Sequence, residues 1–283
     1  MTQVREGIHT LPDAIYHADP CPAPSLSNSL MKTLLGKTPS HAWHAHPRLN
    51  PAYKPYHDDK FDPGTVAHAM LLEGGKGIVT VDAEDWRSKD AKAQRDIIRA
   101  EGMTAILARQ WDEAQEMAQA ARVFLEGSSL AGILADGKPE QTVVWQEHGA
   151  WCRAKLDWLT SDRSVILDYK TTSTPNPAAF MRWSMHQFGY DTQDAFYRRG
   201  IHILTSRVPD FVFLVQEDTA PFACYLVQAD TSMREVATHK ITRGIDIWRH
   251  CVDANSWPAY EPTIYTADAQ AWAIAEEEAH VSF

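Results

Sequence analysis

The sequence is poor in cysteine and has no long apolar run. Its four cysteines, Cys21, Cys152, Cys224 and Cys251, are scattered, and no two of them form a Cys-x-x-Cys pair. Scattered thiols of this kind are typical of reduced residues in a cytoplasmic protein. No apolar stretch approaches the length of about 20 residues that a membrane-spanning helix needs, and the first residues lack the apolar core of a signal peptide. We therefore expect a cytoplasmic protein without a membrane segment.

Positive charge is also scarce, because 27 Lys and Arg residues stand against 37 Asp and Glu residues, which gives a net charge of −10. This balance argues against a protein that coats nucleic acid by bulk electrostatics. It does not exclude an enzyme with a local basic groove, since affinity comes from the phosphates that are contacted. The basic residues near the middle of the chain are Arg153, Lys155, Arg163, Lys170, Arg182, Arg198 and Arg199.

The most informative stretch runs from Arg153 to Lys170. Its two flanks are alternating or rich in β-branched residues, and the polar residues 161–164 between them have the composition of a turn. This pattern predicts a β-hairpin. The simplest register places Thr160 opposite Val165 across a four-residue loop.

That register places Asp157 directly opposite Asp168, and Lys155 directly opposite Lys170, with all four side chains on one face. Facing carboxylates destabilise a sheet unless a cation, a shared proton or a compensating pair relieves them. The diagonal pairs Lys155–Asp168 and Asp157–Lys170 would neutralise the face without a metal. Alternatively, the two aspartates hold Mg²⁺, which prefers oxygen ligands, and a lysine orients a water for phosphodiester hydrolysis.

Two helical stretches carry further polar side chains. The apolar helix predicted over 64–73 contains His68, and a lone histidine on such a helix is usually a hydrogen-bonded core residue. Tyr190, Gln193 and Tyr197 recur at the spacing of one helix face. This polar stripe is either exposed and inert, or faces a sugar-phosphate backbone.

The order of the predicted elements suggests an α+β fold, a mixed central sheet flanked by helices in a single domain of residues 1–283. We expect an N-terminal segment 1–60 that is irregular up to residue 24, a core 61–230 with a helical insertion at about 82–126, and C-terminal helices in 231–283. The insertion should form two helices broken near Gly102. The other expected elements are helices at 27–35, 64–73 and 232–254, a strand at 140–146 before the hairpin, and a second hairpin from 210–217 and 222–229.

Several of these residues together resemble a known family. They are Gly64-Thr65-x-x-His68, Glu140, Asp157, Asp168-Tyr169-Lys170 with Thr171-Thr172, and Gln193-x-x-x-Tyr197. In this order and spacing they resemble the PD-(D/E)xK nuclease superfamily, with its restriction-endonuclease-like core, and most of all its branch of RecE-type exonucleases (exonuclease VIII) and RecB-type nuclease domains. The upstream Ser27-Asn28-Ser29-Leu30 and Thr38-Pro39-Ser40-His41 are also similar to that branch, so that the resemblance covers roughly residues 25–230.

The resemblance implies a role for each matched residue. Asp157, Asp168 and His68 would hold the catalytic Mg²⁺, for which Mn²⁺ is a plausible substitute because imidazole suits transition metals. Lys170 would position the attacking water. Among the remaining candidates, Gln193 and Tyr197 would orient the nucleophile region or the DNA backbone, Glu140 would lie at the edge of the site, and the expected DNA-binding residues are Arg153, Lys155, Thr171, Thr172, Tyr190 and Arg198.

The resemblance also implies an activity and partners. The implied activity is hydrolysis of one strand of linear duplex DNA from an end, in the 5′-to-3′ direction. The implied assembly is a homo-oligomeric ring (trimer or tetramer) around the DNA, and the implied partner is a single-strand annealing recombinase of phage or prophage origin. Asp168 stands where many members have Glu. Some relatives hold an iron–sulfur cluster, but Cys224 and Cys251 are 27 residues apart, and we expect no cluster.

Two alternatives remain open from the sequence. The first is a nuclease of the same superfamily that acts on flaps, nicks or single-stranded DNA. The second is a non-catalytic DNA-binding or assembly protein on the same fold, for which the net charge of −10 and the diagonal salt bridges leave room.

Overall fold

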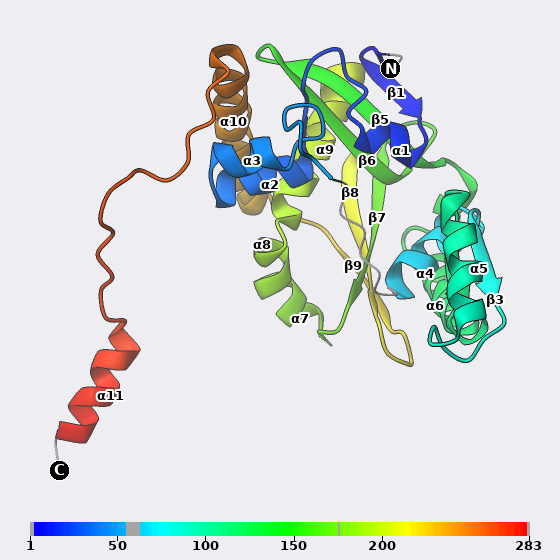
Figure 1. The fold of residues 1–283 in the computed structure, drawn as a ribbon. Coiled ribbons are helices and arrows are strands. Elements are labelled where there is room, and N and C mark those ends of the chain that lie inside the picture. The colour runs from blue at the N-terminus through cyan, green and yellow to red at the C-terminus, as the bar shows by residue number, and fades with distance from the viewer. Residues whose placement is uncertain (1–2, 55–62, 175, 282–283) are drawn as a thin grey trace.

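A seven-stranded sheet forms the centre of the computed structural model, which describes residues 3–54, 63–174 and 176–281 (Figure 1). The strand order is β1 (Gly7–Thr10), β5 (Lys138–Glu147), β6 (Ala150–Leu159), β7 (Val165–Thr172), β8 (Asp210–Glu217) and β9 (Cys224–Val227), with β2 (Leu26–Ser27) beside β6. The pairs β7–β8 and β2–β6 are parallel and the others are antiparallel. The predicted α+β fold with a mixed central sheet is therefore confirmed.

Helices cover both faces of this sheet, and each face has its own buried cluster. Successive strand residues point to opposite faces, so that Phe211 and Phe213 belong to one cluster and Val212 and Leu214 to the other. The helices are α1 (Asp13–His17), α2 (Asn28–Gly36), α3 (Pro39–His44), α4 (Pro63–Leu72), α5 (Lys89–Ala100), α6 (Ala108–Glu126), α7 (Pro177–Ala179), α8 (Met185–Gln187), α9 (Tyr190–Thr205), α10 (Thr231–Ala254) and α11 (Ala271–Val281), with a 3₁₀ turn at Ile133–Ala135 and a π-helical turn at Phe180–Ser184.

The first face is packed by α2, α9 and α10. The rings of Trp145 on β5 and Phe196 on α9 lie 4.8 Å apart. Helix α9 comes this close because residue 200 is a glycine, whose added Cβ would lie 2.8 Å from the Trp145 ring. This contact fixes α9 against the middle of the sheet.

The second face is packed by α4 and α6, which lie on the other side of the sheet in Figure 1. Helix α4 is apolar, and Val66, Ala67, Met70 and Leu71 on it are buried. It is held by α6, where Arg122 donates a hydrogen bond of 2.5 Å to the carbonyl oxygen of Met70. This packing fixes the position of α4, and of its few polar side chains, relative to the sheet.

The two helices expected in the insertion are present, and the break near Gly102 is confirmed by its positive φ of 76°. The insertion also contains β3 (Ile78–Val81) and β4 (Thr104–Leu107), a two-stranded parallel sheet that the sequence analysis did not predict. The apolar residues of this stretch predict Val123 on the buried side of α6, but Val123 is 63% exposed.

The N-terminal segment corrects one expectation, because residues 1–24 are not irregular throughout. Strand β1 pairs with β5 along the edge of the sheet, and α1 follows it. The proline-containing stretch 47–60 is predicted to form a loop, and it lies partly outside the described residues. The expected hairpin of β8 and β9 and the long helix α10 are confirmed.

The chain leaves the body of the protein after α10. Trp257 packs against Trp248 at 5.0 Å between ring centroids, and the carbonyl oxygen of Pro258 accepts a hydrogen bond from Ser40 N. Beyond this point the segment is exposed, with Ile264 at 93% and Trp272 at 70%, and Figure 1 shows α11 apart from the sheet. Within the described residues, no helix has both the length and the apolar character required to cross a bilayer.

Candidate active site

A two-residue turn sets the register of β5 and β6. His148 and Gly149 both have positive φ, which is the geometry of a type I′ hairpin, and Glu147 pairs with Ala150 directly across it. Counting seven residues back along each strand places Glu140 opposite Asp157. The pairs on either side of this position form, but Glu140 has a φ of 53° and leaves the ladder.

The register of β6 and β7 is the one that the sequence predicts. Trp158 pairs with Leu167 and Leu159 with Ile166, which places Asp157 opposite Asp168. Backbone pairing stops there, and the Oδ2 atom of Asp157 accepts a hydrogen bond of 2.9 Å from Tyr169 N. Glu140, Asp157 and Asp168 therefore form one row across three neighbouring strands, at the point where β6 and β7 separate.

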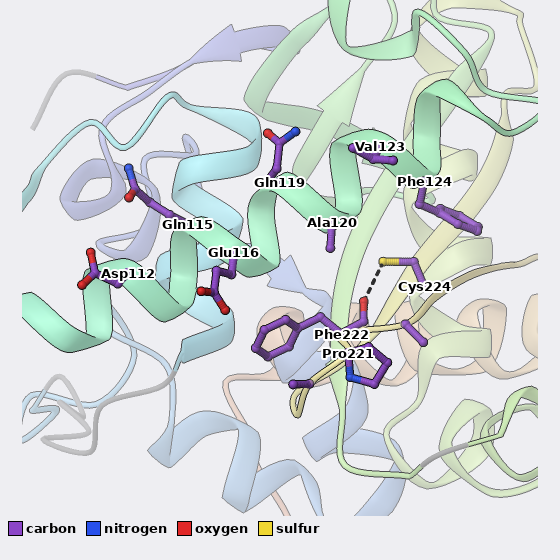
Figure 2. A pocket seen from close by; sticks show the side chains of 12 residues that line it. Asp112, Gln115, Glu116, Gln119, Ala120, Val123, Phe124, Pro221, Phe222 and Cys224 are labelled. Carbon is purple, nitrogen blue, oxygen red and sulfur yellow. Dashed lines mark hydrogen bonds between the residues drawn. The ribbon is translucent and has the colours of Figure 1, made fainter.

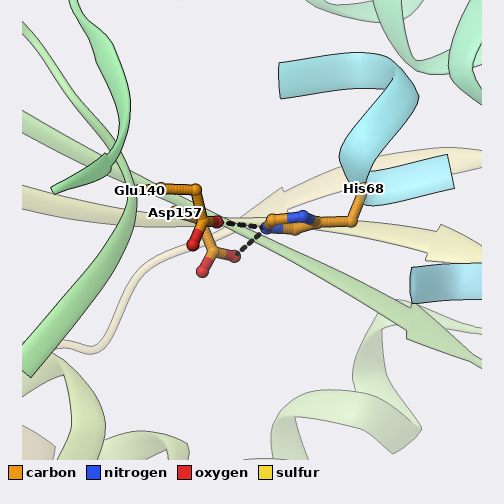
Figure 3. A group of neighbouring side chains, drawn as sticks. All are labelled: His68, Glu140 and Asp157. Carbon is orange, nitrogen blue, oxygen red and sulfur yellow. Dashed lines mark ion pairs between the residues drawn. The ribbon is translucent and has the colours of Figure 1, made fainter. Parts of the chain in front are cut away.

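His68 reaches this row from α4 (Figure 3). Its Nε2 atom lies 3.3 Å from Asp157 Oδ2 and 3.5 Å from Glu140 Oε1. One nitrogen and two carboxylate oxygens thus lie within 4.8 Å of one another. Carboxylate oxygens suit Mg²⁺ and the imidazole extends the set to Mn²⁺, so this donor set fits a divalent metal ion.

Asp168 and Lys170 form the second half of the site. Asp168 is fully buried, and its Oδ2 atom accepts a hydrogen bond of 2.5 Å from Gln193 Nε2 on α9. Its other oxygen is paired with the ammonium group of Lys170. That ammonium group also lies 5.4 Å from the centre of the Tyr190 ring. The row is thus contacted by α4 from one face of the sheet and by α9 from the other.

The crowding of carboxylates changes their acidity. Burial raises the pKa of both Glu140 and Asp168 to about 7, and the charge of Asp157 adds to the rise in each case. Burial also raises the pKa of Asp157, but Lys170 and His68 outweigh it and leave the pKa below its usual value. Asp157 is therefore the carboxylate that carries the most persistent negative charge.

His68 is held in its charged form when no metal is bound. Burial lowers its pKa, but the hydrogen bond and charge of Asp157, with the charges of Glu140 and Asp168, raise it to about 9. Burial likewise lowers the pKa of Lys170, and Asp168 and Asp157 reverse this effect and raise it. The positive charges of His68, Lys170 and Lys155 offset the negative charges of the three carboxylates. A metal ion would take over the role of the His68 proton.

The diagonal salt bridges considered above do not form. Lys155 instead pairs with Glu140, with 2.6 Å between Nζ and Oε2, and with Asp13. Lys170 pairs with Asp168 on its own strand. In a regular strand, the two residues on either side of Asp157 would point to the same face of the sheet. Leu156 and Trp158 instead pack into opposite clusters, so the alternation of side chains is broken at Asp157.

Two of the expected DNA-binding arginines are engaged elsewhere. Arg153 is buried, and its guanidinium group donates to the backbone oxygen and hydroxyl of Ser25. Arg198 donates a hydrogen bond of 2.7 Å to the carbonyl oxygen of Pro209. These contacts tie β6 to the N-terminal segment and α9 to β8, so the structure does not present either arginine beside the carboxylate row.

The other candidates lie at different depths around the site. Tyr197 is buried and packs against Phe211, which places it behind Gln193 and not on the surface. Thr172 is buried and accepts a hydrogen bond from the backbone of residue 174, while Thr171 is half-buried. Tyr190 is half-buried beside Lys170. Of the expected polar stripe, Gln193 therefore touches a carboxylate, and Tyr197 lies behind it, packed against Phe211 and hydrogen-bonded to Gln193.

Sequence reasoning missed two features of the site. It placed Glu140 at the edge, although the turn at His148 and Gly149 fixes Glu140 opposite Asp157 by counting alone. It also missed Lys32 on α2, whose charge interacts with Lys170 and Asp168. No local sequence pattern indicates that Lys32 lies near the site, because it is 138 positions before Lys170 in the sequence.

A groove lies away from this row (Figure 2). It has a volume of about 1110 Å³ and runs between α6 and the chain that joins β8 to β9, with Phe124, Pro221 and Phe222 along it. Two acidic residues of α6, Asp112 and Glu116, rim the groove, and none of the row's carboxylates lines it. The chemistry of the row, and not the size of this groove, identifies the site.

Comparisons with known proteins identify the family and the fold. The model of a PDDEXK-like domain of unknown function (DUF3799) matches residues 27–266. A crystal structure of a candidate exonuclease from Eubacterium rectale is 14% identical, with a TM-score of 0.57 over 89% of this chain and 92% of that one. A phage-related exonuclease from Haemophilus somnus 129PT is also 14% identical, covering 71% of this chain and 98% of that one, with a TM-score of only 0.31. The search of curated proteins found no match.

Proposed function

Because this chain belongs to the family of PDDEXK-like domains described as DUF3799, we propose that it is a metal-dependent nuclease that hydrolyses phosphodiester bonds in DNA. The observation that carries the proposal is the convergence of His68, Glu140 and Asp157 within 4.8 Å, beside a lysine held by Asp168. A charge ladder that only stabilised the sheet would not need a histidine from a separate helix.

Each residue then has a defined task. His68, Glu140 and Asp157 would hold the cation together with Asp168, and a divalent cation there would supply Lewis acidity toward the phosphate and a water. Lys170 orients the attacking water and neutralises charge that develops on the phosphate oxygens. Its position depends on Asp168, which Gln193 holds in turn. Lys170 keeps its proton at neutral pH, because Asp168 and Asp157 raise its pKa.

The substrate and the biological setting are finer proposals that the resemblance to RecE-type exonucleases supports. We propose digestion of one strand of linear duplex DNA from an end, in the 5′-to-3′ direction, which would expose single strands for recombination. A ring-shaped homo-oligomer around the DNA and a single-strand annealing recombinase as partner belong to the same proposal.

The first prediction concerns Lys170. Replacing it in Lys170→Ala should lower the rate of DNA hydrolysis at least about 100-fold, because a group that stabilises transition-state charge is lost. The measurement is release of label from 5′-end-labelled linear duplex DNA in Mg²⁺ or Mn²⁺, with EDTA as the metal-free reference. Lys37→Ala, at the exposed end of α2, is the matched control and should keep wild-type activity.

The choice of DNA separates the alternatives. An exonuclease digests linear DNA and spares the covalently closed circle, whereas a nuclease of flaps or nicks requires those structures. If the wild-type protein digested none of the linear, nicked, flap or single-stranded substrates with either metal, the nuclease proposal would be wrong. A non-catalytic DNA-binding protein would then be the better description.

A further inference from the structure

Lys32 lies beside the active site and is tightly placed there. It belongs to α2, and its Nζ atom donates a hydrogen bond of 3.0 Å to the carbonyl oxygen of Phe188, just before α9. The stem of Lys32 runs over Gly189, where an added Cβ would lie 2.6 Å from Lys32 Cδ. Gly189 has a φ of 65° and no side chain, and both properties leave room for the lysine.

The charge of Lys32 is not compensated by the protein residues around it. Within the described part of the chain, Lys32 forms no ion pair with a carboxylate. Burial and the like charge of Lys170 both lower its pKa, and Asp168, which opposes them, is already paired with Lys170. Two ammonium groups held near each other with one shared carboxylate favour the binding of an anion between or beside them.

The residue whose carbonyl Lys32 contacts also carries an exposed aromatic ring. The side chain of Phe188 is 50% exposed, and its ring centre lies 5.7 Å from that of Tyr190. Tyr190 in turn contacts Lys170 through the cation–π interaction described above. A series of contacts therefore leads away from the carboxylate row, from Lys170 to the Tyr190 ring and from there to the Phe188 ring. Lys32 joins this series at the backbone carbonyl of Phe188.

We propose that Lys32 and Phe188 form a nucleotide-binding subsite next to the active site, with a backbone phosphate on the Lys32 ammonium and an unpaired base stacked on Phe188. Aromatic rings and cationic groups in alternation are what single-stranded nucleic acid binds. The subsite takes the nucleotide that flanks the bond to be cut. It rests on the proposed function, because it takes the substrate of that reaction to be DNA.

A purely structural role would also use the hydrogen bond from Lys32. The Phe188 carbonyl ends the turn of α8, and a lysine there stabilises the end of a helix. This role predicts that removing the ammonium group lowers the melting temperature and leaves the binding of DNA unchanged. The variant Lys32→Met separates the two, because it keeps the stem over Gly189 and removes only the charge.

The test measures binding of a fluorescent single-stranded oligothymidylate at several salt concentrations, in EDTA so that no metal-dependent cleavage occurs. Lys32→Met should bind several-fold more weakly than wild type at low salt. The slope of log K against log salt should become shallower by about 0.7, the loss of one phosphate contact to a single strand. Lys32→Arg should restore the slope, and Lys37→Met should behave as wild type.

Phe188 is tested by the same assay with a different signature. Phe188→Ala should weaken binding about 5- to 150-fold, the range for loss of one stacked base, and should leave the salt slope unchanged. Phe188→Trp should retain affinity. A wild-type slope and affinity in both Lys32→Met and Phe188→Ala would overturn the subsite.

The two proposals fail in distinguishable ways. If the wild-type protein cleaves DNA while Lys32→Met and Phe188→Ala bind as tightly as wild type, the subsite is wrong and the nuclease stands. If binding depends on Lys32 and Phe188 but no cleavage occurs with Mg²⁺ or Mn²⁺, the subsite stands and the nuclease is wrong. If the wild-type protein neither binds nor cleaves, both are overturned.

Discussion

Glu140, Asp157 and Asp168 occupy one row across β5, β6 and β7, and they repel one another when no metal is bound. The sequence predicted the Asp157–Asp168 half of this row, because a hairpin register follows from its turn. The position of Glu140 follows from the preceding turn by the same rule. His68 could be connected to the row only by resemblance, since nothing in its local sequence determines where α4 packs. Lys32 could not be predicted, because its place depends on the packing of α2 against α9.

The acidity of Glu140 yields a prediction about stability. Burial and Asp157 raise its pKa from 4.5 to about 7, so the folded state binds more protons than the unfolded state between these values. This contribution to stability is complete below about pH 4.5 and is lost as the pH rises through 7. Glu140→Gln should therefore stabilise the metal-free protein by about 2 kcal/mol at pH 8, and by less at pH 5.5.

Denaturant unfolding in EDTA at the two pH values measures this difference. With saturating Mn²⁺ the order should reverse, because the wild-type protein gains the free energy of metal binding and the variant loses a ligand. A destabilised Glu140→Gln variant at pH 8 in EDTA would show that its pairing with Lys155 outweighs the repulsion from Asp157.

At the scale of elements, long periodic segments were predictable and short strands were not. Helices α6, α9 and α10 and the hairpins carry their patterns over many residues. Strands β1, β3 and β4 have four residues each, and their pairing depends on partners far along the chain. The same limit applies to α9, whose sequence shows a helix but not the close approach to β5 that brings Gln193 to Asp168.

A substitution at Gly200 tests the close approach of α9 to β5. Gly200→Ala should destabilise the protein by about 1–3 kcal/mol, because the new Cβ would overlap the Trp145 ring. It should also reduce nuclease activity, since a displaced α9 moves Gln193 away from Asp168. Thermal unfolding and the end-label assay measure the two effects.

The matched control for this change is Gly36→Ala at the end of α2, where an added Cβ meets nothing within 4 Å. This variant should be neutral or slightly stabilised. Equal losses in the two variants would mean that Gly200 does not set the distance between α9 and the sheet.

At the scale of the molecule, one sheet brings together strands that are far apart in the sequence. Among its described side chains, the C-terminal arm, residues 264–281, contributes no buried residue to the core around this sheet. The sequence predicted a helix near the C-terminus, but it held no information on whether that helix packs on the body. Before this exposed segment the chain contacts the body through Trp257, Pro258 and Tyr260, whose ring centre lies 5.8 Å from that of His41.

Removing residues 264–283 should therefore change the melting temperature by less than about 2 °C, because the described part of this segment is almost wholly exposed. Differential scanning calorimetry measures this directly. A longer truncation after Asn255 is the informative comparison, since it also removes Trp257 and should lower the melting temperature. A large loss in the shorter truncation would indicate that the arm packs on the protein in solution.

The hydrogen bond from Tyr169 N to Asp157 has a consequence for descent within the family. The Asp157 side chain accepts the backbone hydrogen bond of Tyr169 at the point where β6 and β7 separate. Asp157 therefore supports the sheet as well as the site, and a descendant without catalytic activity would still be selected to retain this aspartate. Lys170 has no such backbone contact to maintain among the described interactions. In comparing descendants, loss of Lys170 or His68 would therefore mark an inactive copy sooner than loss of Asp157.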